Sequence, residues 1–479
     1  MLAELCLPLV KEGGWFLAMK SVDSDAETAA AAHALDILGG RLEKAEDYVI
    51  PGTDVRHRLL FIKKVKENPA VETVYALPGN GGIAADAVCV PEIGAKDISA
   101  IVDFAVEHQV DFAVVAPDDP LALGCVDALH EAGIPCFGPD AKAARIESSK
   151  VFSKNLMKKY GIPTAAYEVF DDFDAAMAYI EAAPLPLVVK ADGLALGKGV
   201  TVAMSREEAR AAIRAAMQER VFGESGARLV IEEYLEGPEV SVLSFTDGVT
   251  LVPMLASMDH KRALDGDEGP NTGGMGAICP NPHYTPELAA ECMEKIFLPT
   301  MRAMNAEGRT FRGCLYFGLM LTKDGPKVIE YNCRFGDPET QAVLPLLETD
   351  LLDIMEATAA GRLSELDIRW SPGASCCLIL ASGGYPRAYK KGLPIEGLDA
   401  RGRLPGSGVE VYHAGTRFEG GKYYTNGGRV LGLTAVAPTL EEAVARAYAA
   451  SERVSFEGMH KRLDIGARAL QGPGGAGAC

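Results

Sequence analysis

The residue pair best suited to hold a metal ion is Glu330 and Asn332, in the string EYNCRFGDPETQ (330–341). An apolar run ending at Ile329 precedes it and predicts a strand, on which residues two apart point to the same side. Carboxylate and amide oxygens are the ligands that Mg²⁺ takes together with nucleotide phosphates. A Glu-x-Asn pair by itself is more often a solvated strand end, so this assignment depends on the other motifs.

The loop after this pair carries charge of both signs. Arg334, Asp337 and Glu339 follow within a few residues. Such a loop is suited to fixing a polar substrate beside a metal–phosphate centre. The alternative is a charged turn in solvent.

A glycine-rich segment lies earlier, in PLVVKADGLALGKGVTVA (186–203). Lys190 ends a Val-rich strand, and the glycines that follow let the backbone approach a ligand closely. The spacing is not that of a P-loop, which has four residues between its glycines and a Ser or Thr after the lysine. A flap over phosphates and a hairpin turn with a solvated lysine fit this string equally well. The flap residues are Gly193, Gly197, Lys198 and Gly199.

Two further segments add binding groups. LVIEEYLEGPEVSV (229–242) predicts a strand running into Glu232, Glu233 and Leu235, with Glu239 opening the next strand. Backbone groups there suit an adenine edge, and a carboxylate suits ribose hydroxyls, although acidic strand ends are common. MDHKRALDGDEGPNTGGMGA (258–277) gathers charge around five glycines. Exposed N–H groups of such backbone bind anions, and the apolar exit at Met275–Ile278 predicts docking on a core rather than a free loop.

Composition limits the class of protein. The chain has 479 residues, of which 48% are hydrophobic and 24% charged, and this length predicts about three domains. The net charge of −19 argues against a nucleic-acid or membrane-surface partner. The 11 cysteines show no metal spacing and favour a reducing, cytoplasmic compartment. We expect no membrane-spanning segment and no signal peptide.

Four segments are predicted. Residues 1–66 alternate strand, Ala-rich helix (25–38), strand (42–50) and an apolar-basic run (57–65). Residues 67–147 have the βαβαβ spacing of a parallel sheet with functional loops at the strand ends. Residues 148–345 hold the glycine-rich loops, and residues 346–479 form an α+β domain that ends in a glycine-rich, disordered tail.

The order of these motifs resembles an ATP-grasp fold, in which carboxylates are activated as acyl phosphates between two subdomains. The strings DHKR, GPNTGGMGA and RFGDPETQ are similar to the glycinamide ribonucleotide synthetase family, as are LPGNGGIA (77–84), SKVFSKNLMKKYGIPT (149–164), HAGT (413–416) and TNGGRVLG (425–432). The likeness covers about residues 67–470. It implies α/β and α+β architecture: a pre-ATP-grasp parallel-sheet domain, an ATP-grasp domain and a C-terminal domain.

The resemblance also implies an activity and its residues. The expected reaction joins glycine to 5-phosphoribosylamine with ATP and Mg²⁺ or Mn²⁺, in a monomer whose partners are small molecules. It assigns ATP to Lys150, Lys190, Gly193, Gly197, Lys198, Gly199, Glu232, Glu233, Leu235 and Glu239, and the metal to Glu330 and Asn332. It assigns catalysis to Arg334, Asp337, Lys261 and Asn271, and substrates to Asn80, Asp118, Thr272, Gly273, Gly274 and Glu339.

The N-terminus does not follow this family, whose members open with a strand, a glycine-rich loop and an Arg-Glu-His. In a gap-free alignment of residues 49–69, Gly52 and His57 stay, while Thr53 and Asp54 replace loop glycines. Residues 1–65 instead resemble the C-terminal end of the small-subunit ribosomal RNA guanine-7 methyltransferase family, without its cofactor-binding segments. This implies a foreign βαββ fragment with no methyltransferase activity.

The junction leads to one structural hypothesis and to competing functions. We expect Asp47–Ile50 to replace the missing first strand of the parallel sheet and His57–Lys66 to form its first helix. The altered loop at 51–57 is expected to weaken phosphoribosylamine binding. The alternatives to the ligase are a different ATP-grasp carboxylate–amine ligase and a fusion product with impaired binding of that substrate.

Overall fold

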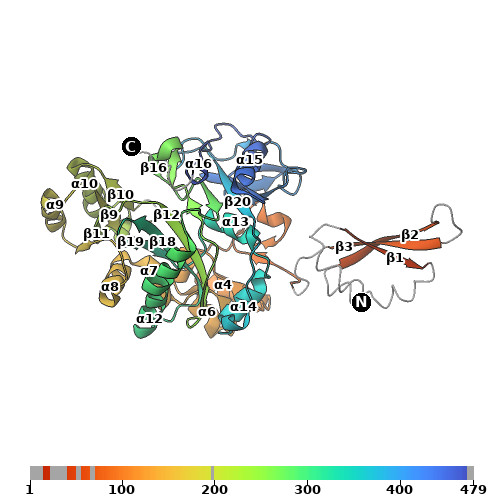
Figure 1. Cartoon of the computed structure of the whole chain (residues 1–479), viewed down its shortest axis with the longest axis horizontal. Coiled ribbons are helices and arrows are strands. Elements are labelled where there is room, and N and C mark those ends of the chain that lie inside the picture. Colours follow the sequence, from red (N-terminus) through yellow and green to blue (C-terminus); the bar gives the residue numbers. More distant parts are fainter. Residues whose placement is uncertain (1–14, 22–39, 50–55, 65–70, 196–198, 472–479) are drawn as a thin grey trace. The chain divides into compact units, whose positions relative to one another are not determined.

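The computed structural model describes residues 71–195 and 199–471, together with the backbone of 15–21, 40–49 and 56–64. The chain forms two compact units, Met1–Tyr75 and Ala76–Cys479 (Figure 1). Each is described by itself. Among the described residues, no helix has both the length and the apolar character needed to cross a membrane.

The first unit contains a three-stranded antiparallel sheet. Strands β1 (Trp15–Ser21), β2 (Gly40–Val49) and β3 (Arg56–Lys64) are arranged in the order β1-β3-β2. The predicted strands of the βαββ fragment are present, and the predicted helix at 25–38 lies outside the described residues. The expected helix over His57–Lys66 is wrong, because β3 pairs with β2 along its length, from Gly40↔Lys64 to Val49↔Arg56. Its contiguous apolar run lacks helical periodicity and suits a strand.

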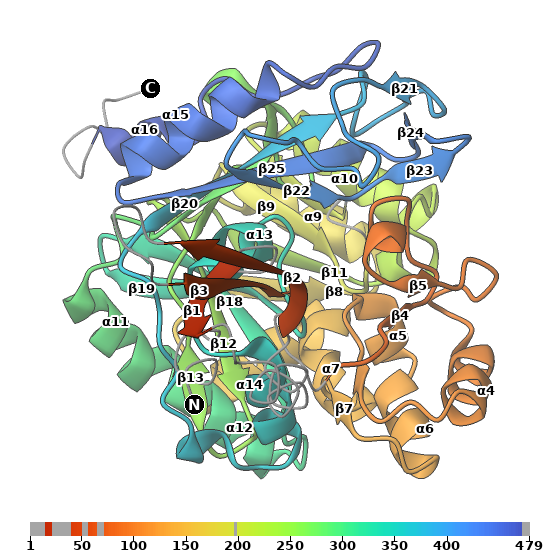
Figure 2. The same cartoon turned by 90° about the vertical axis from the view of Figure 1, so that its right-hand side faces the viewer.

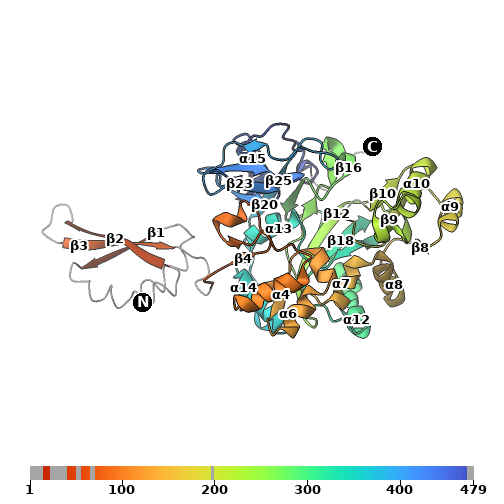
Figure 3. The same ribbon diagram turned by 180° about the vertical axis from the view of Figure 1, so that it is seen from behind.

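Residues 71–147 alternate short strands and helices, as the spacing predicted. Strands β6 (Ala113–Val114) and β7 (Cys136–Phe137) pair in parallel, whereas β4 (Tyr75–Ala76) pairs with β5 (Val88–Cys89). The two pairs are separate sheets within the described chain. The expectation that Asp47–Ile50 replaces the missing first strand of the parallel sheet is also wrong, because Asp47–Val49 pair with β3. The helices are α4 (Ile98–Glu107), α5 (Asp118–Ala122), α6 (Cys125–Glu131) and α7 (Ala141–Ser148); α4 and α6 pack side by side (Figure 3).

The next segment begins with α8 (Lys150–Tyr160) and builds a four-stranded sheet in the order β10-β9-β11-β8. Its strands are β8 (Tyr167–Phe170), β9 (Leu187–Ala191), β10 (Val200–Ala203) and β11 (Leu229–Glu233). Helices α9 (Phe173–Ala182) and α10 (Arg206–Ile213) cover one face of it (Figure 1), and their Ala and Ile side chains pack against the Val-rich strands.

A second four-stranded sheet has the order β13-β12-β18-β19. It consists of β12 (Glu239–Thr246), β13 (Leu251–Pro253), β18 (Gly313–Thr322) and β19 (Gly325–Asn332). A bulge in β19 shifts the register, so that Gly318 faces Glu330 while Leu319 faces Val328. Tyr331 is buried between the partly exposed Glu330 and Asn332, which confirms that the latter two share a face. Helices α11 (Pro286–Cys292) and α12 (Leu298–Ala306) lie between β13 and β18 in the chain.

The C-terminal residues form most of a five-stranded sheet. This sheet also includes two strands from the 258–277 segment. Its order is β14-β17-β20-β25-β22, and α15 (Leu440–Ser451) lies along β20 and β25 (Figure 2). Met275 and Ile278 are fully buried there, which confirms the predicted docking of this loop. The strands are β14 (Met258–Asp259), β17 (Gly276–Cys279), β20 (Ala374–Ala381), β22 (Val409–His413) and β25 (Arg429–Ala437).

Smaller elements complete the second unit. They are β15 (Arg262–Leu264), β16 (Glu268–Asn271), β21 (Pro394–Ile395), β23 (Thr416–Glu419), β24 (Lys422–Thr425), α13 (Glu339–Val343), α14 (Leu351–Ala359) and α16 (Ala467–Leu470).

Candidate active site

A cavity of about 1930 Å³ collects most of the predicted site residues. It is lined from both four-stranded sheets, from the 258–277 segment and from the C-terminal sheet. Gly197 and Lys198 lie outside the described residues. Predicted residues that line the cavity are Asp118, Lys150, Lys190, Gly199, Glu232, Glu233, Leu235, Glu239, Lys261, Asn271, Thr272, Gly273, Glu330, Asn332, Arg334, Asp337 and Glu339; Asn80, Gly193 and Gly274 do not.

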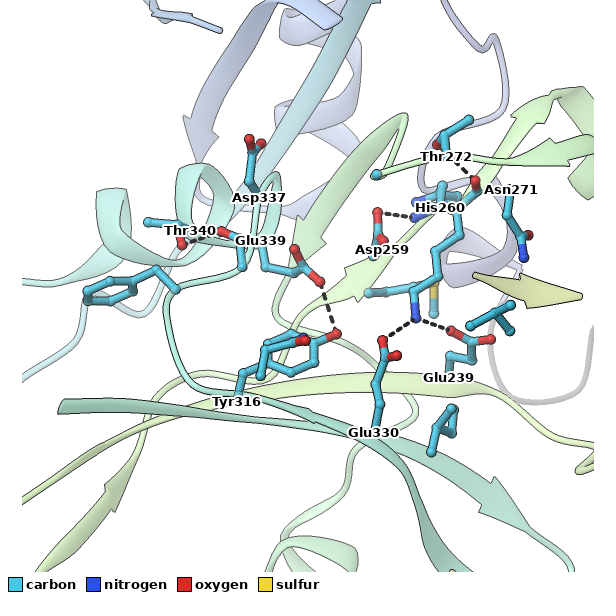
Figure 4. A pocket seen from close by; sticks show the side chains of 18 of the residues that line it. Glu239, Asp259, His260, Asn271, Thr272, Tyr316, Glu330, Asp337, Glu339 and Thr340 are labelled. Carbon is cyan, nitrogen blue, oxygen red and sulfur yellow. Dashed lines mark hydrogen bonds and ion pairs between the residues drawn. The ribbon is translucent and has the colours of Figure 1, made fainter. Parts of the chain in front are cut away.

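The predicted metal pair lies at the end of β19. Lys261 Nζ lies 3.5 Å from Glu330 Oε1 and 3.2 Å from Glu239 Oε2, so one cation joins the two carboxylates (Figure 4). Burial opposes ionisation of Glu330, but Lys261 and other nearby lysines outweigh it and hold the pKa of Glu330 below its ordinary value. Glu330 is therefore ionised at neutral pH.

The donor set at this point fits a hard divalent cation. Glu330 offers a carboxylate and Asn332 an amide oxygen from the same face of β19. Among the described residues no cluster of three or more His, Cys, Asp or Glu could enclose a metal ion. Two oxygen ligands from protein, completed by phosphate and water, are the usual arrangement for Mg²⁺ on a nucleotide. The position of Lys261 also shows that this site accepts positive charge.

A buried ion network lies next to the metal pair. Lys154 Nζ and Lys190 Nζ each lie 3.0 Å from Glu232 Oε2, and all three side chains are at most 5% exposed. Lys190 also donates to the Ile329 carbonyl at 3.1 Å, next to Glu330. Burial lowers the pKa of Lys154 to about 8. The second oxygen, Glu232 Oε1, is buried without a hydrogen-bond partner.

Lys150 is positioned by the start of α8. Ser149 caps this helix by accepting from Phe152 N, and Asp192 Oδ1 accepts from Val151 N at 2.7 Å. This hydrogen bond links the loop after β9 to the start of α8. Lys150 Nζ donates to the Gly193 carbonyl at 3.1 Å, where the predicted flap begins. Gly193 thus contacts Lys150 although it does not line the cavity.

The side chain of Glu233, in the predicted nucleotide segment, is held by two protein groups, and its expected nucleotide contact stays a prediction. The Glu233 carboxylate accepts from Ala166 N at 3.0 Å and pairs with Lys327 at 3.2 Å. Its oxygen therefore stabilises the junction of β11 with the second sheet. Leu235 and Glu239 line the cavity beside it.

Asp259 of the 258–277 segment and Glu339 of α13 bring two further carboxylates to the cavity. Burial, and next the Glu339 carboxylate, raise the pKa of Asp259 well above its ordinary range. Glu339 Oε1 accepts from Tyr316 Oη at 3.1 Å (Figure 4). It also accepts from Ser241 Oγ at 3.3 Å. Gly274, at φ +113°, allows a close approach, since a Cβ there would lie 2.4 Å from Pro338 Cδ. The glycine-rich loop around Gly274 therefore packs directly against the acidic loop around Pro338.

Arg429, on β25, joins these two loops. The sequence motifs did not identify it as a site residue. Its guanidinium donates to the Gly273 carbonyl at 2.8 Å and to the Asp337 carbonyl at 2.7 Å, and it pairs with Asp337 Oδ2 at 3.0 Å. The TNGGRVLG string contained this residue, but no spacing in the sequence connects it to positions 273 and 337.

Asn80 lies apart from the cavity lining. Its side-chain nitrogen donates to the His413 carbonyl at 2.8 Å, and its oxygen accepts from Gly82 N and Ile83 N, both at 2.9 Å. The amide therefore ties a loop after β4 to the C-terminal domain. The expected substrate contact of Asn80 stays a prediction.

Taken together, the cavity holds oxygen ligands for a cation, several lysines and two glycine-rich loops. Lys150, Lys190 and Lys261 all act on Glu330 electrostatically. Such a concentration of cations around one carboxylate suits phosphoryl transfer, in which charge develops on the transferring group.

Comparison with known proteins gives matches over nearly the whole cavity-bearing unit. Models of phosphoribosylglycinamide synthetase match in three parts: the N domain at residues 49–147, the ATP-grasp (A) domain at 148–340 and the C domain at 375–468. A phosphoribosylamine–glycine ligase from Vibrio vulnificus is 48% identical over 409 residues, covering 85% of this chain and 95% of that protein. One from Caldanaerobacter subterraneus is 45% identical, covering 88% and 99%.

A solved structure agrees with these matches. The crystal structure of phosphoribosylamine–glycine ligase from Thermotoga maritima has a TM-score of 0.71 and 35% identity, covering 83% of this chain and 94% of that one. The N-domain match begins at residue 49, ahead of the predicted boundary at 67. The resemblance of residues 1–65 to a methyltransferase fragment stays a prediction.

Proposed function

The chain belongs to the phosphoribosylglycinamide synthetase family, and we propose that it ligates glycine to 5-phosphoribosylamine with ATP, as a step of purine biosynthesis. The products are glycinamide ribonucleotide, ADP and phosphate. The observation that carries the assignment to this chain's own residues is the cluster of Lys150, Lys190 and Lys261 around Glu330. ATP and a divalent cation follow from the ATP-grasp domain.

The first step activates glycine. Its carboxylate is a poor electrophile, so a carboxylate oxygen attacks the γ-phosphorus of ATP, the bond to the β-phosphate oxygen breaks, and glycyl phosphate and ADP result. Lys150 and Lys190 bind the phosphates, and Glu330 and Asn332 hold Mg²⁺ or Mn²⁺. A bound divalent cation neutralises charge on the phosphates.

The second step forms the amide. The phosphoribosylamine nitrogen attacks the glycyl carbonyl, loses a proton and expels phosphate. Arg334 and Asp337 line the cavity beside Glu339, where they suit the acyl phosphate and its glycine. Asp118 approaches from the N domain, where phosphoribosylamine is expected. Exclusion of water by the loop at 258–277 protects the acyl phosphate from hydrolysis.

Glu232, Leu235 and Glu239 are proposed to surround the nucleoside. The buried Glu232 Oε1 lacks a partner, and a donor on the base would satisfy it. We assign the enzyme to the cytoplasm as a monomer with small-molecule partners. Domain limits of 1–66, 67–147, 148–345 and 346–479 remain our proposal, with the first of these a fragment outside the catalytic unit.

The test is product analysis with the purified full chain. We expect ADP release that requires glycine and phosphoribosylamine together, and a product of the mass of glycinamide ribonucleotide. ADP release with a different acceptor amine instead would favour another carboxylate–amine ligase. Release of ADP and glycine hydroxamate with hydroxylamine, without reaction of phosphoribosylamine, would favour a fusion product damaged at its amine site.

A further inference from the structure

One buried carboxylate lies directly behind the metal pair and belongs to no motif identified in the sequence. Glu147, near the end of α7, is 7% exposed and lines the cavity. Its Oε2 accepts from Cys333 N at 2.7 Å and from Cys333 Sγ at 2.9 Å. Its Oε1 pairs with Arg334 at 3.0 Å. The carboxylate thus binds the backbone and two side chains immediately after β19.

The same carboxylate determines which end of the Asn332 amide faces it. The neighbours on that side, Glu147 Oε1 and the Tyr331 carbonyl, are both acceptors, so the amide nitrogen must point to them. In that orientation Asn332 Nδ2 donates to Glu147 Oε1 at 3.0 Å and to the Tyr331 carbonyl at 3.2 Å. Because an amide is planar with oxygen and nitrogen on opposite branches, Asn332 Oδ1 is then turned away from Glu147.

Orientation matters because only the oxygen of an amide ligates a cation. A half-turn of Asn332 about its last bond would exchange oxygen for an NH₂ group and remove one of the two protein ligands. A neutral neighbour would discriminate weakly between the two orientations. A carboxylate that accepts from the nitrogen discriminates strongly, because the reverse orientation would place two oxygens together.

We propose that Glu147 is a positioning residue that keeps Asn332 Oδ1 directed at the divalent cation and holds Arg334 beside the phosphates. This inference rests on the proposed function, since it concerns the cation bound with the nucleotide. Loss of a residue that orients a metal ligand in this way typically weakens metal binding by about 10- to 100-fold.

The first test is the Glu147→Gln variant of the full chain, titrated with Mn²⁺ in the presence of ADP and followed by electron paramagnetic resonance. The glutamine oxygen stays with Cys333 N, so its NH₂ faces Asn332, and Asn332 turns its oxygen inward. We expect the Kd for Mn²⁺ to rise about 10- to 100-fold. An unchanged Kd overturns the proposal.

A second test exchanges the charge between positions 147 and 332. It distinguishes an effect on the orientation of the residue 332 side chain from a simple loss of packing. Asn332→Asp in the native background places two carboxylates together and should weaken Mn²⁺ binding. In the Glu147→Gln background the same substitution should strengthen it, because the introduced glutamine amide donates to the new carboxylate. A change of sign between the two backgrounds is the expected result of the double-mutant cycle. Equal effects in both backgrounds contradict the proposal.

Two controls complete the design. Cys333→Ala removes a thiol donor to Glu147 but keeps the backbone donor and should leave the Kd unchanged. If Glu147→Gln does not fold, as judged by its thermal transition, Glu147→Asp supplies the test, because it retracts the acceptor while keeping its charge. Absence of Mn²⁺ binding by the unaltered chain with ADP would contradict the proposed function itself, whereas normal binding by that chain and by every variant contradicts only the role of Glu147.

Discussion

Lys190 Nζ lies 3.0 Å from Glu232 Oε2, with both side chains almost completely buried between the two four-stranded sheets. Lys154 lies at the same distance from the same oxygen. One carboxylate therefore compensates two buried ammonium groups, one of which is proposed to bind phosphate. Under the proposed function, the pair would stabilise the fold and also position a phosphate-binding lysine.

Glu232→Gln should destabilise the chain, because it leaves Lys154 and Lys190 buried without a counter-charge. Loss of one partner of a buried pair costs about 3–5 kcal/mol. Chemical denaturation should show a decrease of that size in the free energy of unfolding. Glu236→Gln makes the same chemical change on an exposed side chain and should have no effect. Equal stability of the two variants would refute this account of the network.

Glu330→Gln should remove the charged metal ligand without removing the side chain. We expect kcat/KM to fall about 10²- to 10³-fold, the scale for loss of one preorganised charge-stabilising group. Steady-state kinetics with saturating glycine measures this. Asp324→Asn, at the turn between β18 and β19 and exposed, is the matched control. A Glu330→Gln enzyme with native kcat/KM would exclude Glu330 as a ligand.

Arg429→Met should separate the 273 and 337 loops, because it removes donors to both carbonyls. A displacement of about 1 Å in a positioning group can cost about 10²-fold in rate, so we expect a marked fall in kcat/KM for glycine. Arg446→Met is the control, since Arg446 is half-exposed and pairs with Glu442 on the same helix. If both variants retain native glycine kinetics, the bridge has no role in catalysis.

His260 should make the stability of the fold depend on pH. Its Nε2 accepts from Gly466 N at 3.2 Å, and burial lowers its pKa from 6.5 to about 4. Between these values the unfolded chain binds more protons than the folded chain, so this contribution is complete above pH 6.5 and is lost as the pH falls toward 4. The integrated effect is about 3 kcal/mol.

Denaturation curves at several pH values measure this effect. His260→Gln should flatten the dependence of the unfolding free energy between pH 6.5 and 4, whatever its effect at pH 7. An identical slope in the native chain and in His260→Gln would contradict the assignment.

The altered loop at 51–57 should raise the Michaelis constant for phosphoribosylamine, while those for ATP and glycine stay in the range of relatives. Residues 50–55 lie outside the described part of the chain, so kinetics must decide. Thr53→Gly combined with Asp54→Gly should lower that constant, because glycine restores backbone freedom. A Michaelis constant for phosphoribosylamine equal to that of the Vibrio vulnificus ligase would contradict this prediction.

Local sequence patterns were sufficient to predict the strand and the loop that carry candidate site residues. The period of two along β19 placed Glu330 and Asn332 on one face, and the glycine spacing placed a loop after Lys190. The junction was less predictable: the run at 57–64 fits either parent protein, and pairing with β2 selects the strand. Local preference cannot decide such a case, because the partner strand provides the hydrogen bonds.

The sequence by itself determined the chemistry: a pair of oxygen ligands, several lysines and two glycine-rich loops, in the order of one family. Only the tertiary structure decided which groups orient them. Glu147 is 186 positions from Cys333, and Arg429 is 156 from Gly273. Contacts of this length leave no period or spacing in the chain, because they depend on how separate elements pack. The assignment of Glu330 therefore needed only the motifs and their order along the chain, whereas the orientation of Asn332 required the fold.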